Sequence, residues 1–402
     1  MIYRLKDVLE DKGYIRGPFG SALKRSEMLN DGIPVYEQQN AIYENRDFRY
    51  YINEEKYEKL KRFTVKENDL IVSCSGTVGK VSIIRKNDEI GIISQALLIL
   101  RPNIKIVLPE FLYYFFKSNK GYNSIVSRSS GSVQVNIAKR QVIEEIEIEI
   151  PTLEEQRGLI QVLSDLDEKI ETNNKINKKL EEMAQAIFKQ WFVDFEFPNE
   201  DGKPYKSSGG EMVESELGMI PKGWRQSTLE EVAIMSAGGD KPKCFSKNAT
   251  EDYDVPIYSN GIDNEGLYGY TDKAKIFEEA ITVSARGTIG YVCLRQQPYF
   301  PIVRLISLVP HKSIITSKYL YFYLKLINIS GTGTTQQQLT VPDFKRTKIC
   351  IPKYQVIKQF TDMVNDIFRK IEVGKNENMK LAELRDTLLP KLMSGEIRVS
   401  ID

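Results

Sequence analysis

The sequence predicts a mixed α/β protein with two globular domains, each followed by a long helix, and three observations support this fold class. The chain has 402 residues, enough for two or three domains that each bury a core. Short β-rich runs and glycine turns recur in the same order in both halves. Each half ends in a stretch with a helical period of apolar residues. An apolar content of 41% excludes wholesale disorder.

The internal repeat can be followed through five pairs of segments. In chain order they are 3–8 with 224–232, 33–36 with 255–258, 70–79 with 280–290, 110–115 with 318–323, and 134–151 with 336–352. The third pair places a glycine turn between two β-type strands, and the fourth predicts a short aromatic helix that packs on a sheet. Each half is therefore expected to fold as the same globular unit.

Beyond Pro151 and Pro352 the matched residues stay 201 positions apart, and they predict two helices paired as an antiparallel coiled coil. Inserting one residue would rotate all later positions by about 100° off a helical seam, so paired helices keep their register. The alternative is that each helix packs only on its own domain. The predicted seam residues are Leu159, Leu163, Leu166, Ile170, Asn173, Asn177, Leu180, Ala184 and Ile187 in the first helix, and Phe360, Val364, Ile367, Ile371, Gly374, Asn378, Leu381, Arg385 and Leu388 in the second.

Local signals mark the helix ends and the remaining segments. Thr152 and Glu155 have capping-box spacing, whereas Pro390 and the pair Ser394-Gly395 indicate where the second helix stops. A helix over 153–190 would measure roughly 55 Å. The predicted segments are a first domain over 1–151, a helix over 152–193, a connector over 194–222, a second domain over 223–352, a helix over 353–395 and a tail over 396–402.

Charge and cysteine usage limit the class of protein. The net charge of +1 divides into +3 for residues 1–150, +4 for 221–350 and −6 for the rest, which permits DNA binding without proving it. The N-terminus is charged, and the apolar run near 92–100 is broken by Ser94 and Gln95. We therefore expect no export signal and no membrane span. The four cysteines lack CxxC spacing, and we expect buried thiols in a reducing cytoplasm. His311 has no neighbouring ligand, so no metal site is expected.

Motifs for catalysis are missing from the sequence. An adenine methyltransferase needs a loop with two consecutive prolines for the flipped base, and the chain has no Pro-Pro pair. Residues 76–80 resemble part of a phosphate loop, but Cys74 and Val81 stand where the motif needs Gly and Ser or Thr. The glycines are therefore better interpreted as a tight turn.

Loops rich in Asn, Gln, Arg, Lys, Ser and Thr provide the candidates for contact with base edges, because these side chains match the donors and acceptors of the major groove. A solvated loop is the competing interpretation for each residue alone, but the loops recur at matched positions. The candidates are Ser21, Lys24, Gln38, Gln39, Asn40, Ser75, Thr77, Arg128, Ser129, Ser132 and Gln134 in the first half, and Lys241, Lys243, Ser259, Asn260, Arg286, Thr288, Thr334, Thr335, Gln336 and Gln337 in the second.

Four strings resemble the specificity subunits of type I restriction-modification systems: 182–195, 204–210, 220–224 and 388–397. The resemblance spans essentially the whole chain and implies a non-catalytic subunit. It implies two target recognition domains that read the halves of a bipartite double-stranded DNA site. It also implies helices that act as a spacer and dock two methyltransferase subunits, with restriction subunits in the full complex. S-adenosylmethionine would be bound by the methyltransferase partner and no cofactor by this chain. The pair Glu155-Gln156 fits the family pattern, whereas Val356-Ile357 departs from it.

Two other functions remain open at this point. One is a protein-interaction scaffold, and the other is a self-sufficient DNA-modifying enzyme, which the missing motifs disfavour. The aromatic residues at the end of the first helix fit either a partner surface or a packed core; they are Phe188, Trp191, Phe192 and Phe195.

Overall fold

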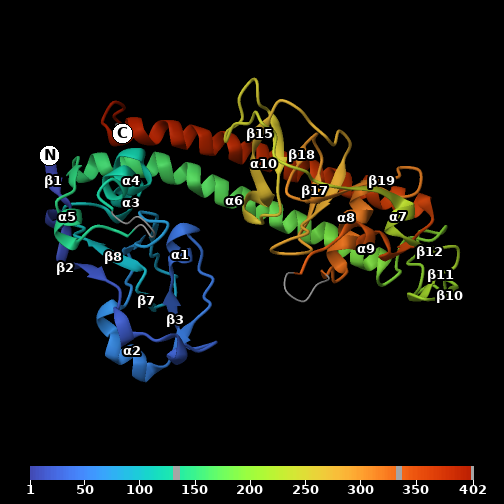
Figure 1. Ribbon diagram of the computed structural model, residues 1–402, viewed down its shortest axis with the longest axis horizontal. Helices are drawn as coiled ribbons and strands as arrows, with labels where there is room; N and C mark the ends of the chain where they lie inside the picture. Colours follow the sequence, from blue (N-terminus) through green and yellow to red (C-terminus); the bar gives the residue numbers. More distant parts are fainter. Residues whose placement is uncertain (130–135, 332–336, 400–402) are drawn as a thin grey trace. The chain divides into compact units, whose positions relative to one another are not determined.

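The computed structural model describes residues 1–129, 136–331 and 337–399, and the chain divides into two units (Figure 1). Unit 1 comprises residues 1–173 and 376–402, and unit 2 comprises residues 174–375. Each unit therefore contains one globular domain and part of each long helix. The mixed α/β fold class is confirmed.

Unit 1 is built on a four-stranded antiparallel sheet in the order β2-β8-β5-β6. A second sheet has the order β4-β3-β7, in which β3 and β7 are parallel, and β1 pairs with β9. The strands are β1 (Ile2–Arg4), β2 (Leu9–Arg16), β3 (Ile33–Tyr36), β4 (Tyr51–Ile52), β5 (Leu70–Ser73), β6 (Val81–Ile83), β7 (Ile92–Ile93), β8 (Leu97–Pro102) and β9 (Glu147–Glu149).

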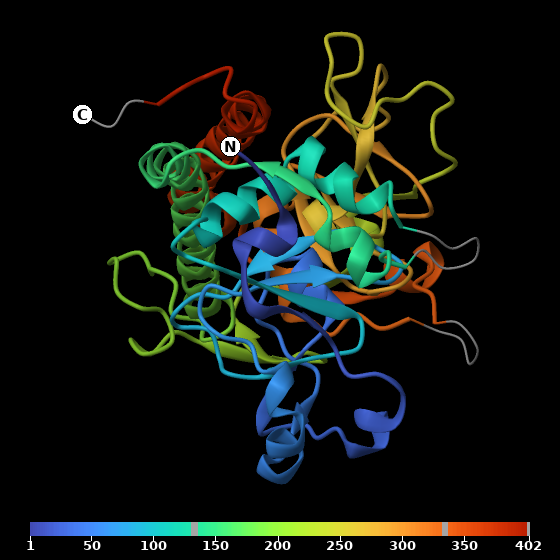
Figure 2. The same cartoon turned by 90° about the vertical axis from the view of Figure 1, so that its left-hand side faces the viewer.

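The helices of unit 1 cover the first sheet and complete its core. In Figure 2 the teal helices α3 (Pro109–Lys117) and α4 (Asn119–Val126) lie over the light-blue strands. Six consecutive residues of α3, Phe111 to Phe116, are buried, so nearly the whole aromatic helix belongs to the core, as predicted. The short helices are α1 (Gln38–Ile42), α2 (Glu54–Leu60) and α5 (Arg140–Glu144).

Unit 2 repeats this topology. Its sheets have the orders β13-β19-β16-β17 and β15-β14-β18, with β14 and β18 parallel, and β12 pairs with β20. The elements are β12 (Arg225–Thr228), α7 (Leu229–Val232), β13 (Ala233–Ala237), β14 (Val255–Tyr258), β15 (Leu267–Thr271), β16 (Ala280–Val283), β17 (Val292–Arg295), β18 (Phe300–Pro301), β19 (Ile306–Pro310), α8 (Ser317–Leu326), α9 (Val341–Lys345) and β20 (Lys348–Ile351). The internal repeat is thus present as two copies of one arrangement of strands.

The long helices are α6 (Leu153–Phe192) and α10 (Tyr354–Met393), and they pair antiparallel in both units. In unit 1, Asp167 contacts Arg385 at 2.7 Å and Asn173 contacts Asn378 at 2.9 Å. The green start of α6 and the red end of α10 lie side by side in both views. In unit 2, the rings of Phe188 and Phe360 are 5.7 Å apart. The pairing predicted from the heptad pattern is confirmed.

Most of the predicted seam positions are shielded from solvent. Leu163, Ala184, Phe360 and Val364 have no exposed surface, and the remaining apolar positions are buried or half-buried. The aromatic residues Phe188, Trp191 and Phe192 belong to the core of unit 2, so core packing accounts for them. Phe195 is half-buried against the same core.

The helix ends follow the sequence signals. Thr152 Oγ1 accepts a hydrogen bond from the Glu155 N–H at 3.2 Å, and Glu155 accepts one from the Thr152 N–H at 2.9 Å, so the capping box is formed. Helix α10 ends at Met393 after Pro390, and Gly395 follows with a φ of 73°.

The connector contains the hairpin β10 (Met212–Ser215) and β11 (Gly218–Pro221). Cys74 and Cys293 are buried and Cys350 is half-buried, but Cys244 lies exposed in a loop, so the prediction of four buried thiols was wrong for Cys244. None of the helices in the described residues has the length and apolar composition that a membrane span requires.

Candidate nucleic-acid interface

The glycine turn has the same backbone in both units. After β5 the Gly79 N–H donates to the Ser73 carbonyl at 2.9 Å, and after β16 the Gly290 N–H donates to the Ser284 carbonyl at 3.0 Å. Gly79 and Gly290 have φ values of 84° and 83°, in the left-handed region that favours glycine. The turn explains both glycines without a bound phosphate.

In unit 1 three separate segments meet at this turn. The Gln38 side-chain amide, at the start of α1, donates to the Ser75 carbonyl, and Ser75 Oγ donates to Asn136 Oδ1 at 2.8 Å. The Ile137 N–H donates to the Cys74 carbonyl at 2.9 Å. Gln38 and Ser75 were predicted candidates, and the structure brings them together.

Unit 2 builds the same junction from different side chains. Asn260 Oδ1 accepts a hydrogen bond from the Ala285 N–H at 2.7 Å, and Arg286 donates to Gln338 Oε1 at 3.0 and 3.2 Å. The Leu339 N–H donates to the Ala285 carbonyl at 3.0 Å, as Ile137 does to Cys74 in unit 1. The two junctions have matching backbone and unlike side chains, which suits recognition of two unlike ligands by one fold.

A pocket of 880 Å³ opens beside the junction of unit 1. Its described lining has three basic side chains and no acidic one, so it favours a negatively charged ligand. The lining residues are Tyr14, Arg16, Phe19, Gln38, Ser75, Gln95, Ala96, Asn136, Ile137, Ala138, Lys139 and Arg140. Burial raises the pKa of Tyr14 to about 12, so its hydroxyl stays neutral at physiological pH.

Several predicted candidates hold loops together. Asn40 is fully buried; its Oδ1 accepts from the Glu37 N–H at 2.7 Å and its amide donates to the Asp47 carbonyl at 3.1 Å. The Gln39 amide also donates to the Asp47 carbonyl, at 3.0 Å, and Ser259 Oγ contacts the Gly266 carbonyl at 3.4 Å. These contacts shape the loops from which other side chains project.

The remaining candidates form other contacts, are exposed to solvent, or lie outside the described residues. Arg128 and Ser129 bond to carbonyls of α4 at 2.7 and 3.0 Å, and Lys241 lies 4.7 Å from the Phe245 ring. Lys24, Thr77, Lys243, Thr288 and Gln337 are exposed, and Ser21 lies in the short 3-10 helix Gly20–Ala22. Ser132, Gln134, Thr334, Thr335 and Gln336 lie outside the described residues.

The sequence interpretation missed the basic lining and one member of the junction of unit 1. Arg16, Lys139 and Arg140 line the pocket, and Asn136 completes the junction. The available signal was the repeat itself, because 136–137 and 338–339 precede the last β runs of their halves.

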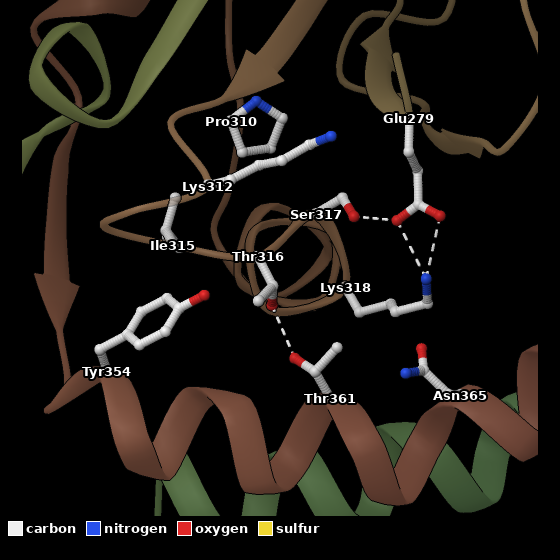
Figure 3. Close-up of a pocket in the computed structure, with 10 residues that line it drawn as sticks. All are labelled: Glu279, Pro310, Lys312, Ile315, Thr316, Ser317, Lys318, Tyr354, Thr361 and Asn365. Carbon is white, nitrogen blue, oxygen red and sulfur yellow. Dashed lines mark hydrogen bonds and ion pairs between the residues drawn. The ribbon is translucent and has the colours of Figure 1, made fainter.

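A second pocket, of 340 Å³, lies in unit 2 beside the start of α10 and contains none of the predicted residues (Figure 3). Its polar groups bond mainly to one another: Lys318 pairs with Glu279 at 3.0 Å, and the Thr316 and Thr361 hydroxyls are 2.7 Å apart. These contacts join α8 to Glu279 and to α10, so a structural role accounts for them.

No group of three acidic, cysteine or histidine side chains that could hold a metal occurs within the described ranges. Burial raises the pKa of the Cys74 thiol, at the junction of unit 1, to about 12, so this thiol is not a nucleophile at neutral pH. The site is suited to binding.

Comparison with known proteins identifies the family. Residues 1–182 and 221–383 match the family described as "Type I restriction modification DNA specificity domain". The chain belongs to this family. As a specificity subunit it is the DNA-recognition component of a type I restriction-modification system and not its catalytic component.

Named relatives agree with this assignment. A type I restriction enzyme specificity subunit from Methanocaldococcus jannaschii is 28% identical over 97% of this chain and 93% of its own length. One from Haemophilus influenzae is 27% identical, covering 76% of this chain and 81% of its own length. The crystal structure of a type I S subunit from M. genitalium shares the fold with a TM-score of 0.53 and 17% identity, over 98% of this chain and 95% of that chain.

Proposed function

We propose that this specificity subunit reads an asymmetric bipartite DNA sequence, with the junction of unit 1 contacting one half-site and the junction of unit 2 the other. The observation that supports this is the repeated junction itself. Gln38, Ser75 and Asn136 stand where the second unit has Asn260, Arg286 and Gln338. Matching backbones with unlike side chains predict two half-sites of different sequence.

The candidates on these loops divide into two roles. Gln38, Ser75, Thr77, Arg286, Thr288 and Gln337 belong to the junction loops and are proposed to face base edges. Lys24, Arg128, Lys241 and Lys243 are proposed to contact phosphates, which position the duplex and carry no direct sequence information.

We further propose that paired helices α6 and α10 dock two methyltransferase subunits, which bind S-adenosylmethionine, and that restriction subunits join the full complex in the cytoplasm. Apolar side chains on the helices support a docking role. Ile176, Met183, Val373 and Met379 are all more than half exposed. Membership of the specificity family favours this function over a general protein scaffold and over a self-sufficient enzyme.

The test is to express the chain with its methyltransferase partner and map methylated adenines in cellular DNA. The expected result is one motif with two unlike halves and an unspecified spacer, absent when the chain is deleted. Binding of the purified complex to that duplex should weaken steeply with salt. The proposal would be contradicted if methylation followed no sequence motif. It would also be contradicted if the purified complex did not bind the duplex at any salt concentration.

A further inference from the structure

A short turn at the same place in each unit carries a polar side chain that the loop analysis overlooked. In unit 1 the turn Ser94–Leu97 joins β7 to β8, and in unit 2 the turn Ile302–Leu305 joins β18 to β19. The Leu97 N–H donates to the Ser94 carbonyl at 3.1 Å, and the Leu305 N–H donates to the Ile302 carbonyl at 3.0 Å. Both are four-residue turns closed by the same hydrogen bond, with Gln95 as the second residue of its turn and Arg304 as the third.

Equivalent backbone hydrogen bonds to neighbouring segments hold the two turns in place. Ser94 and Ile302 donate backbone hydrogen bonds to the carbonyls of Tyr36 and Tyr258, at 2.8 and 2.9 Å. The carbonyls of Leu97 and Leu305 accept from Gly17 and Gly238, at 3.0 and 2.8 Å. A Cβ at Gly17 would lie 2.0 Å from the Ser94 carbonyl oxygen, so the chain packs too closely there for any other residue. Each turn is therefore held rigidly, which a precise binding contact needs.

Both turns also join the junctions described above. In unit 1 the Cys74 N–H donates to the Ala96 carbonyl at 2.9 Å. In unit 2 Asn260 Nδ2 donates to the Val303 carbonyl at 2.6 Å, while its Oδ1 holds the glycine turn. In unit 1, Gln38 and Gln95 also line the same pocket, so a ligand bound there is within reach of both side chains.

The side chains of Gln95 and Arg304, at the tips of the two turns, are exposed to solvent. Gln95 lines the pocket of 880 Å³, and neither Gln95 nor Arg304 forms a side-chain hydrogen bond or ion pair with the part of the chain that the structure describes. Val303 and Arg304 have φ values of 53° and 61°, an unfavourable conformation for a β-branched residue. Such backbone conformations persist where the surroundings fix them, and they cluster at binding sites.

From this matched pair of anchored turns we propose that Gln95 and Arg304 are specificity-determining residues, one for each half-site of the DNA. The chemistry of the side chains suggests the bases. A glutamine amide forms two hydrogen bonds with the N6 and N7 atoms of adenine, and an arginine guanidinium forms two with the O6 and N7 atoms of guanine. The inference rests on the proposed function, because it needs DNA at both junctions.

The test uses the complex of the full chain with its methyltransferase partner and a library of duplexes randomised within the wild-type motif. Gln95→Ala should relax one position in one half-site, with a roughly 5- to 150-fold loss of preference for the original base. Arg304→Ala should do so in the other half-site. Arg304→Lys should also relax that position, because lysine keeps the charge but lacks the two-pronged guanidinium. Gln296→Ala, at an exposed position directly after β17, is the matched control and should keep the motif.

The alternative outcomes are separable. The inference would be overturned if the Gln95 and Arg304 variants kept the wild-type motif. It would also be overturned if both variants relaxed the sequence preference in the same half-site. If Arg304→Ala weakened binding equally on all DNA sequences and reduced the salt dependence of binding, Arg304 would be a phosphate contact. This result would also overturn the inference. Gln95→Glu, which keeps the size of the side chain, provides a second readout should the alanine variant unfold. If the wild-type complex has no bipartite motif, it is the proposed function that fails.

Discussion

Asn173 in α6 donates a hydrogen bond from its side-chain amide to Asn378 Oδ1 in α10, at 2.9 Å, in the seam between the two helices. The same amide donates to Glu377 at 2.8 Å, and only 5% of Asn173 is exposed. The 201-residue repeat pairs Asn173 with Gly374, and Asn177 with Asn378. A Cβ at Gly374 would lie 2.7 Å from the Asn177 side chain. At the equivalent position of unit 2 one partner is therefore a glycine, whose missing side chain leaves room for Asn177. A buried polar pair in a coiled coil fixes its register.

Replacing Asn173 by alanine should therefore lower the free energy of unfolding of unit 1 by about 1–3 kcal/mol, because Asn378 and Glu377 lose a buried donor. Urea unfolding monitored by circular dichroism measures the change. Lys178→Ala, on the exposed face of the same helix, is the control and should shift stability by less than about 0.5 kcal/mol. Equal effects of both substitutions would contradict a role for the polar pair.

Gln156 and Ile357 occupy equivalent positions at the helix starts, and each is fully buried. Gln156 Oε1 accepts from the Leu108 N–H at 2.7 Å, and its amide donates to the carbonyls of Ile106 and Pro151 at 3.1 and 3.0 Å. Ile357 instead packs in the apolar core of unit 2. The departure from the family pattern at Val356-Ile357 is thus a change from a hydrogen-bonded to an apolar anchor.

Exchanging these two residues should destabilise both units. Gln156→Ile leaves the Leu108 N–H and two carbonyls without their partner, at a cost of about 1–3 kcal/mol for each buried group left unpaired. Ile357→Gln buries an amide among apolar side chains, at a cost of about 1–3 kcal/mol. Thermal unfolding of each variant checks this, and a neutral Gln156→Ile would show that the bonds are dispensable.

The sequence predicted the features that depend on periodicity and local chemistry. The heptad seam predicted the paired helices, and Thr152 with Glu155 predicted the cap. It could not separate base readers from loop supports, because that depends on long-range contacts. Asn40 looks like a reader in the sequence but is buried by contacts with Glu37 and Asp47. Arg304 follows an apolar run without polar neighbours, so only the β18–β19 turn reveals its exposure.

Glu181 is expected to make the stability of unit 2 depend on pH in the acidic range. Burial opposes ionisation of this carboxylate, but hydrogen bonds from Lys325, at 2.6 Å, and Tyr321 outweigh it, and its pKa lies below the usual 4.5. A carboxyl with a lowered folded-state pKa stabilises the fold above its unfolded pKa, and this contribution is lost as the pH falls through the folded-state value.

We expect Glu181→Gln to be less stable than wild type at neutral pH, and to lose less stability as the pH falls from about 5 to 3. Hydrogen exchange of the α8 amides across this range measures the local effect. Glu182→Gln, which removes an exposed pair with Lys179, should change the pH profile less. Parallel profiles for wild type and Glu181→Gln would rule out this source of acid sensitivity.

Arg286 donates two hydrogen bonds to Gln338 and remains exposed at the junction of unit 2. If it contacts a base, Arg286→Ala should reduce discrimination at one position by about 1–3 kcal/mol. Competition binding with single-base variants of the motif provides the measurement. Unchanged sequence preference would mean that Arg286 contacts phosphate or no DNA at all.

The helix seam predicts how the DNA spacer responds to helix length. Seven residues added to both α6 and α10 restore the heptad register and extend each helix by about 10.5 Å, close to three base pairs of DNA. Mapping of methylated sites should then show a spacer about three base pairs longer, with both half-sites unchanged. One residue added to each helix is the control, because it rotates the following seam positions by about 100° and should abolish methylation. A half-site altered by the seven-residue insertion would show that the helices take part in base recognition, because the residues of both junctions are untouched.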